Sequence, residues 1–177
     1  MTELQTRCLD AFPEWLRGLP TDATDLAKLL GDDAVPAAAR QHAASALNYL
    51  FKSLDLIPDG IEDLGFLDDA FVLRVASRLA KDKGASNAVL DRLAKDVPLL
   101  EELLTTDFAR LVAYVEGLVH GAARGRTSEE IVQNPEIRGA FVTELDAWAQ
   151  SYQAPTFTRD EKNLVKLTSF LSAKLPG

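Results

Sequence analysis

The sequence predicts an all-α protein, a compact multi-helix bundle built around a helix–acidic turn–helix hairpin. Apolar residues recur at intervals of three and four along most of the chain, which is typical of helices with one buried face. No run alternates between apolar and polar residues for long enough to indicate a strand. The chain has 177 residues, 47% hydrophobic and 26% charged, so it can bury a globular core without disulfides or a structural metal.

Two helices are expected in the first 31 residues. Residues 2–5 form a capping-box pattern at the start of the first helix. Pro13 is expected to kink or end this helix, and the Gly-Leu-Pro segment at residues 18–20 to stop it. A short second helix is then expected, capped by Thr21 or Asp22 and ended by the next glycine.

The next two helices form the predicted hairpin, at about residues 43–83. Pro36 suits the first position of the earlier helix. The apolar face of that helix comprises Ala43, Leu47, Leu50, Phe51 and Leu54. After an acidic turn, Asp68 is expected to be the N-cap of the later helix, which Gly84 closes.

Two further helices are expected before residue 121. Ser86 is expected to cap the first, and Asp107 caps the second, whose apolar residues follow the clearest amphipathic pattern in the chain. The segment 121–128 is small, polar and locally basic, which makes it the best candidate for a linker. We therefore expect a helical core domain at residues 1–123.

Residues 124–177 are expected to form C-terminal helices that pack on the same domain. Thr127 and Glu130 make another capping box. Pro135 opens an amphipathic helix, and Thr158 is expected to cap the last one.

The most concentrated feature is an acidic corner, defined here as Asp55, Asp59, Asp68 and Asp69. Six carboxylates and no Lys or Arg lie between Ser53 and Asp69. The apolar residues among them are expected to be buried and to hold the acids in fixed relative positions. These apolar residues are Leu54, Leu56, Ile57, Ile61, Leu64, Phe66 and Leu67.

Three interpretations of the acidic corner are open, and we favour the first. In the structural interpretation, Asp68 caps a helix and Asp59 makes an Asx turn. Asp55 then accepts hydrogen bonds from loop N–H groups or pairs with Arg74 or Arg78. In the second interpretation, the four converging carboxylates bind a hard cation such as Mg²⁺, Ca²⁺ or Mn²⁺. The third is acid–base catalysis by a carboxylate pair.

Other candidate residues are isolated. His42 and His120 have no second His or Cys at ligand spacing. Cys8 has the pattern of a core residue, and Arg124 and Arg126 are expected to be solvated. The sequence contains no glycine-rich phosphate loop, no HExxH and no GxSxG, so it predicts no catalytic residue.

The charge and hydropathy exclude several classes of partner. A net charge of -8 and a pI near 4.8 argue against nucleic acid and anionic membrane surfaces. The N-terminus has no secretory pattern, and no apolar stretch approaches the roughly 20 residues of a membrane span. A soluble, cytoplasmic protein is expected.

The segment from Tyr49 to Leu73, YLFKSLDLIPDGIEDLGFLDDAFVL, closely resembles the DUF1232 family, also called YkvA-like. The shared pattern is S-x-D-L-I-P-D, a short spacer, and L-G-[FY]-L-D-D before an apolar helix. The residues that match it are Ser53, Asp55, Leu56, Ile57, Pro58, Asp59, Leu64, Gly65, Phe66, Leu67, Asp68 and Asp69.

The resemblance implies little about activity, because the family has no established biochemical role. Many members carry a long apolar second helix, which implies membrane association. Here charged residues interrupt that helix, which argues against a membrane role. They are Arg74, Arg78, Lys81 and Asp82.

Three functions follow as hypotheses. We expect a non-enzymatic module that binds another protein, because no catalytic constellation is recognisable. The alternative is a divalent-cation-binding protein, or a cation-dependent enzyme acting on a phosphorylated substrate through the acidic corner. A second alternative is peripheral membrane association. No cofactor is expected beyond the Mg²⁺ or Ca²⁺ of the first alternative, and no nucleic acid partner.

Overall fold

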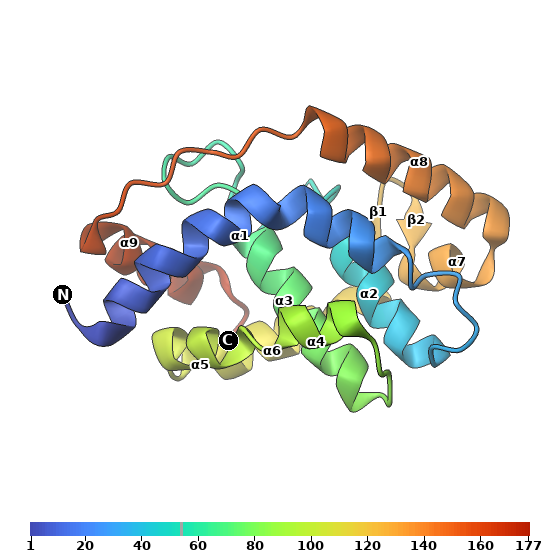
Figure 1. The fold of residues 1–177 in the computed structure, drawn as a ribbon, viewed down its shortest axis with the longest axis horizontal. Helices are drawn as coiled ribbons and strands as arrows, with labels where there is room; N and C mark the ends of the chain where they lie inside the picture. Colours follow the sequence, from blue (N-terminus) through green and yellow to red (C-terminus); the bar gives the residue numbers. More distant parts are fainter. Residues whose placement is uncertain (54) are drawn as a thin grey trace.

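The computed structural model describes residues 1–53 and 55–177, and the regular secondary structure of this part of the chain is almost entirely helical, as predicted (Figure 1). In chain order the elements are α1 (Glu3–Ala27), α2 (Ala37–Tyr49), α3 (Leu67–Asp82), α4 (Ala88–Ala94), α5 (Val97–Leu104), α6 (Asp107–Gly117), a 3-10 turn η1 (Leu118–His120), β1 (Ala122–Ala123), β2 (Arg126–Thr127), α7 (Ser128–Gln133), α8 (Pro135–Ser151) and α9 (Glu161–Lys174).

The central helix of the bundle is α3. It packs against α1, α2, α4, α5 and α6. Of its 16 residues, 13 are buried, and a helix that is covered on nearly all sides lies in the middle of a core. Within the described residues, no helix is long and apolar enough to cross a membrane.

The first helix, α1, continues through Pro13 and Pro20, so the prediction that prolines end it is wrong. Proline lacks the N–H that would bond to the carbonyl four residues earlier. At Pro20 that carbonyl belongs to Leu16, and it accepts a hydrogen bond of 2.7 Å from Tyr152 Oη instead. Ten residues of α1 between Cys8 and Ala27 are buried, so core packing stabilises the helix across both prolines.

A buried ionic network joins α1 to α3 and α4. Asp22 lies inside α1 and is not the helix cap that the sequence predicts. It pairs with Arg92 at 2.5 Å and with Arg74 at 3.5 Å. Arg74 also donates to Asp96 at 3.0 Å, and its guanidinium lies 4.1 Å from the centroid of the Trp15 ring. Buried charges of this kind are found in pairs because an unpaired one is costly.

Most helix starts agree with the sequence to within two residues. The capping boxes at Thr2 and Thr127 are confirmed. The N-cap predicted at Asp68 is wrong, because α3 begins at Leu67 after Phe66, whose φ of 66° is left-handed. Three other helices start close to expectation but with the N-caps Asn87, Thr106 and Asp160.

Residues 122–127, within the segment expected to be a linker, form a short β-hairpin. Strand β1 pairs antiparallel with β2. The two residues between them, Arg124 and Gly125, have φ of 50° and 76°, as two-residue hairpin turns require. Asn48 donates to the carbonyl of Arg126 at 2.9 Å and so attaches the hairpin to α2. The sequence misses these strands because two residues are too few to show alternation.

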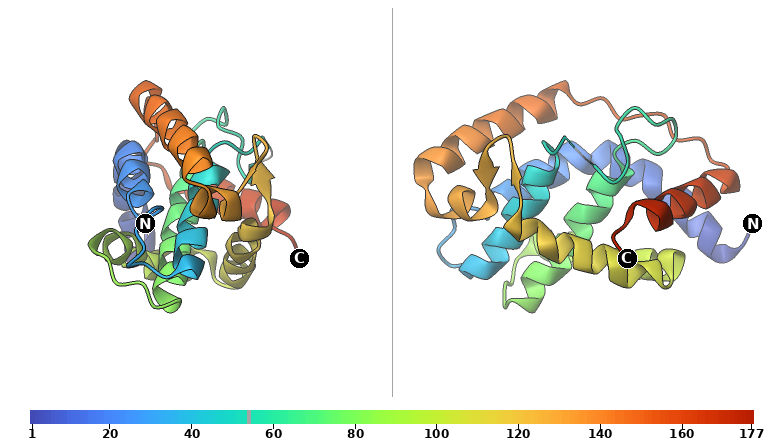
Figure 2. Two further views of the ribbon diagram at one scale, coloured as in Figure 1. Left: turned by 90° about the vertical axis from the view of Figure 1, so that its right-hand side faces the viewer. Right: turned by 180° about the vertical axis from the view of Figure 1, so that it is seen from behind.

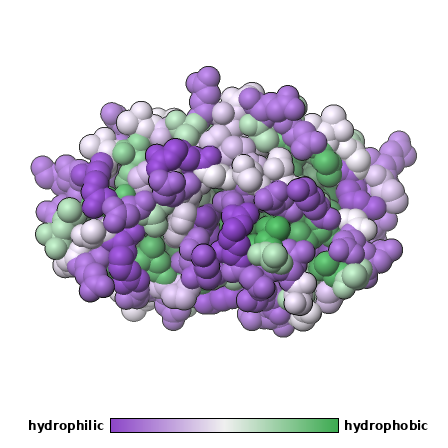
Figure 3. Space-filling model, viewed as in Figure 1, coloured by the Kyte–Doolittle hydropathy of each residue, from purple (hydrophilic) through white to green (hydrophobic). Residues whose placement is uncertain are grey.

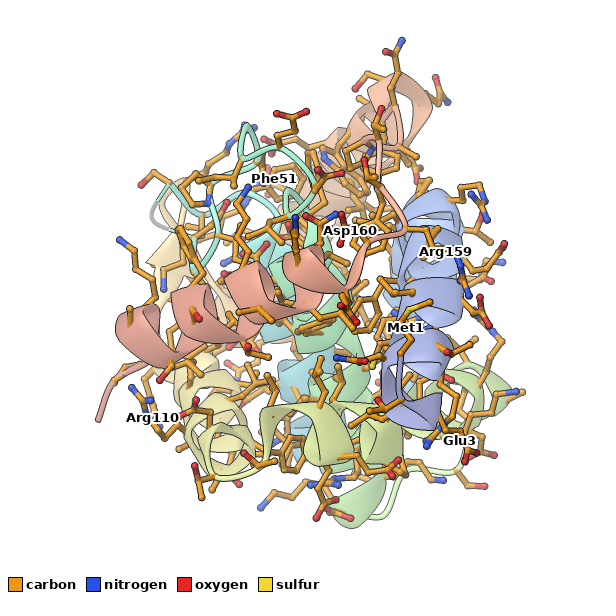
Figure 4. All side chains as sticks on the ribbon, turned by 90° about the vertical axis from the view of Figure 1, so that its left-hand side faces the viewer. Met1, Glu3, Phe51, Arg110, Arg159 and Asp160 are labelled. Carbon is orange, nitrogen blue, oxygen red and sulfur yellow. The ribbon has the colours of Figure 1, made fainter. Side chains whose placement is uncertain are left out.

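The C-terminal helices share the core of the rest of the chain. Buried apolar residues of α7, α8 and α9 belong to one contiguous cluster with those of α1, α2 and α3. Arg159, next to Asp160 at the start of α9, pairs with Asp10 of α1 (Figure 4). Arg110 of α6 donates to backbone carbonyls at the other end of α9. Residues 124–177 are therefore anchored to α1 and α6.

Candidate functional site

The connection between α2 and α3 brings three carboxylates together. Asp59 lies in the loop, whereas Asp68 and Asp69 are in the first turn of α3. One oxygen from each of these three residues lies within 4.8 Å of the oxygens from the other two. The free N–H groups at the start of a helix favour negative charge, which suits this position for acids.

Asp68 holds the loop in place and does not cap α3. Its Oδ2 accepts hydrogen bonds from Tyr49 Oη at 2.6 Å and from the Ile57 N–H at 3.3 Å. Tyr49 Oη also accepts from the Leu56 N–H at 2.7 Å. Asp68 thus joins the end of α2, the loop and α3. Tyr49 is missing from the predicted site, although it opens the segment that resembles DUF1232.

The apolar residues of the loop anchor it largely as expected. Four are buried: Leu56, Ile57, Leu64 and Leu67. Two are half-buried: Ile61 and Phe66. The expected burial of Leu54 lies outside the described residues. This apolar packing fixes the backbone on which the acids stand.

The loop also closes tightly on itself at Gly65. A Cβ at this position would lie 2.1 Å from the carbonyl oxygen of Asp59, so only glycine fits. The Gly65 N–H donates to Ile61 at 2.9 Å. On the outer side of the loop, Asp63 Oδ1 accepts from the Thr158 N–H at 2.7 Å. These contacts set where Asp59 stands relative to α3.

Asp69 is the most unusual member of the group. It is 2% exposed, and no donor from the described residues reaches either of its carboxylate oxygens. The same holds for Oδ1 of Asp68, which is 1% exposed. A buried polar atom without a partner costs about 1–3 kcal/mol, and more when it is charged. A proton, a cation or a bound water would satisfy these oxygens, and of the three only a proton or a cation also neutralises the charge.

Burial raises the pKa of each of these carboxyls. It raises the pKa of Asp68 to about 6, although the hydrogen bonds from Tyr49 and Ile57 lower it. It raises the pKa of Asp69 well above the ordinary value, and the negative charge of Asp68 adds to the rise. Partial desolvation of its carboxyl also raises the pKa of Asp59, although the residue as a whole is exposed. The group therefore favours states in which part of its negative charge is neutralised.

Asp55 lies beside the group of three. Burial, followed by the charges of the other acids, raises its pKa to about 7, and Lys52 lowers it. Its Oδ1 is buried, and no donor from the described part of the chain reaches it. The suggested pairing with Arg74 or Arg78 is not formed, because Arg74 belongs to the buried network and Arg78 pairs with Glu101 at 3.9 Å.

We expect Asp69→Asn to become more stable than the wild type as the pH rises from 4 to 8 in a chelator. The unfolded aspartate ionises near pH 3.9, whereas folded Asp69 keeps its proton to higher pH. Folding therefore binds a proton in this range, and the wild type loses up to about 1.4 kcal/mol per pH unit. Urea unfolding of both proteins at pH 4, 6 and 8 measures this difference. A difference that stays constant with pH would contradict it.

None of the other sequence candidates is among the three residues whose carboxylate oxygens converge. Cys8 is fully buried, and burial raises the pKa of its thiol to about 11. His42 is buried in α2, and burial lowers its pKa, whereas His120 is exposed. Arg124 and Arg126 are not simply solvated, because both pair with Glu144 of α8.

Comparison with known proteins gives a family match for one segment of the chain. Residues 42–74 match the model of a family described as a protein of unknown function, DUF1232. This confirms the resemblance over that segment, which contains Tyr49 and the acidic corner. No curated protein and no solved structure matches the chain.

Proposed function

We propose that this protein binds a divalent cation, with Asp59, Asp68 and Asp69 as its ligands and Asp55 as a further negative charge beside them. The observation that supports this most is Asp69, a buried carboxylate that faces two others and receives no hydrogen bond from the described residues. A cation would occupy its oxygens and remove the repulsion among the three carboxylates.

The ligand set and its dimensions suit a hard cation. Oxygen-only ligands favour Mg²⁺, Ca²⁺ or Mn²⁺. Two ligands on opposite sides of an ion are separated by twice the metal–oxygen distance, about 4.2 Å for Mg²⁺ and about 4.6–5.2 Å for Ca²⁺. The separations of up to 4.8 Å among the three oxygens are within or close to these limits.

A thermal melt tests the proposal. After treatment with a chelator at pH 7.5, the wild type is titrated with Mg²⁺, Ca²⁺ and Mn²⁺. A cation at 100 times its Kd stabilises the fold by about 2.7 kcal/mol, which raises the melting temperature of a chain of this size by about 5–10 °C. Asp69→Asn should melt higher than the wild type in the chelator and show no shift with any cation.

The choice of Asp69 separates ion binding from folding. Asp68→Asn would also disturb the hydrogen bonds of Tyr49 and Ile57, whereas Asp69 makes no hydrogen bond that the substitution would break. Glu62→Gln, an exposed acid in the same loop, is the matched control and should retain the full shift. A wild type that no cation stabilises would refute the site, as would an undiminished shift in Asp69→Asn.

The protein-binding and membrane hypotheses gain no comparable support. Leu64 and Leu67 are buried, and Phe66 packs edge-on against Tyr152 with ring centroids 5.2 Å apart. These residues therefore do not form an apolar groove for a partner. The face drawn in Figure 3 is mostly hydrophilic, and its hydrophobic residues lie in small groups bordered by polar ones. The apolar side chains of α3 are buried in the core and are not available to a lipid surface.

A further inference from the structure

The proposed cation site is reached from solvent beside Asp59. Asp68 and Asp69 are buried, whereas Asp59 is exposed. Asp59 also lines a surface cleft whose other walls are residues 50–53, after α2, and residues 122–124 of the hairpin. Both views of Figure 2 place the hairpin next to the chain that leaves α2. A ligand in this cleft would therefore meet the cation on its open side.

Lys52 brings a positive charge to the cleft. Its side chain is half-buried, and its Nζ donates to Tyr114 Oη, a neutral partner, at 3.2 Å. The same Nζ lies 5.9 Å from the centroid of the Tyr49 ring and 5.3 Å from that of Tyr114. Among the described residues, no carboxylate oxygen lies within 4.0 Å of it. An ammonium group has three donors, so Lys52 can still bind an anion.

Arg124 brings a second positive charge from the opposite wall. Its guanidinium lies 4.9 Å from the centroid of the Phe51 ring and pairs with Glu144, which together orient it. The side chain is nevertheless 57% exposed. A guanidinium has five N–H donors, and a single carboxylate leaves several of them free.

We propose that this cleft binds a phosphate group, as inorganic phosphate or a phosphate monoester, between the cation and the side chains of Lys52 and Arg124. This inference rests on the cation site proposed above. Proteins commonly hold Mg²⁺ with one or two carboxylates together with the phosphate of a ligand. A phosphate can present a separate oxygen to the cation and to each of the two basic side chains, whereas a carboxylate has only two oxygens to share among them. Arg and Lys are the usual partners of its remaining oxygens.

Calorimetric titration with inorganic phosphate tests the inference, in the presence of Mg²⁺ and again in a chelator. We expect Mg²⁺ to tighten phosphate binding at least tenfold, and phosphate to tighten Mg²⁺ binding by the same factor, since coupling between two ligands is reciprocal. The double variant Lys52→Gln/Arg124→Gln should weaken phosphate binding at least tenfold. It should keep the thermal shift with Mg²⁺ alone, which also verifies that it folds. Arg17→Gln, an exposed arginine on α1, is the control and should bind phosphate like the wild type.

The outcomes separate this inference from the cation site. A protein that Mg²⁺ stabilises but that does not bind phosphate keeps the cation site and overturns the phosphate site. Phosphate binding that is equal with and without Mg²⁺ also overturns it, because the phosphate then does not contact the cation. Sedimentation with phosphatidic acid vesicles, without a calorimetric response to free phosphate, overturns a soluble phosphate ligand in favour of the phosphate of a lipid headgroup. A wild type that neither Mg²⁺, Ca²⁺ nor Mn²⁺ stabilises refutes the cation site itself.

Discussion

Arg74→Met should lower the free energy of unfolding by about 3–5 kcal/mol, the range for removing one partner of a buried ion pair. Arg74 is 3% exposed and is the charge that faces both Asp22 and Asp96. Methionine restores most of the volume against Trp15 but leaves Asp22, also buried, with Arg92 as its remaining partner. Urea unfolding monitored by circular dichroism measures the loss.

A matched substitution lies one turn further along α3. Arg78 is half-exposed and pairs with Glu101 at 3.9 Å, so Arg78→Met should cost less than about 1 kcal/mol. The double variant Asp22→Leu/Arg74→Met should recover part of the stability that Arg74→Met loses, because it also removes the buried carboxylate that has lost one of its two cationic partners. If Arg74→Met and Arg78→Met were equally mild, the buried network would contribute no more than an exposed pair.

Gly65→Ala should cost about 3 kcal/mol and weaken cation-dependent stabilisation. The added Cβ would lie 2.1 Å from the carbonyl oxygen of Asp59 and 3.0 Å from its carbonyl carbon. Both atoms belong to the backbone, so the loop must move, and overpacking of this kind usually costs 1–3 kcal/mol or somewhat more. The movement would carry Asp59 away from the two acids of α3. Melts of the variant in chelator and in Mg²⁺ measure both effects.

Gly60 provides the control in the same loop. A Cβ there would meet no atom within 4 Å, and its φ is not left-handed, so Gly60→Ala should change stability by less than about 0.5 kcal/mol. A Gly65→Ala protein that binds the cation as tightly as the Gly60→Ala protein would mean that Asp59 is not a ligand.

The acidic corner illustrates how far local sequence reasoning extends. The density of acids, their position at the start of α3 and the burial of the apolar residues between them can all be predicted, because each depends on neighbouring residues. The convergence of the three carboxylates cannot be predicted in this way. Asp69 is buried by tertiary packing that its neighbours in the sequence do not reveal, whereas Asp68 accepts a hydrogen bond from Tyr49, 19 residues earlier. The preference of aspartate for N-cap positions therefore leads to the wrong prediction for Asp68, since Phe66 occupies the N-cap of α3.

Helix boundaries also divide into those that local sequence sets and those that tertiary contacts set. Capping boxes such as that of Thr2 are local and are predicted correctly. The continuation of α1 through Pro20 is not local, because it depends on Tyr152, 136 residues away, which bonds to the carbonyl that proline leaves free. The short hairpin at Arg124 is likewise held by contacts to α2 and α8.

By itself, the sequence determined that the chain is helical and that four acids gather around one turn, because periodicity and local composition carry that information. Only the tertiary structure decided that Asp59, Asp68 and Asp69 face one another, that Asp69 is buried beyond the reach of the donors described, and that Lys52 and Arg124 border the same cleft as Asp59. The physical reason is that burial and carboxylate separation are set by how α2, α3 and the hairpin pack, and the residues responsible for that packing are far apart in the chain.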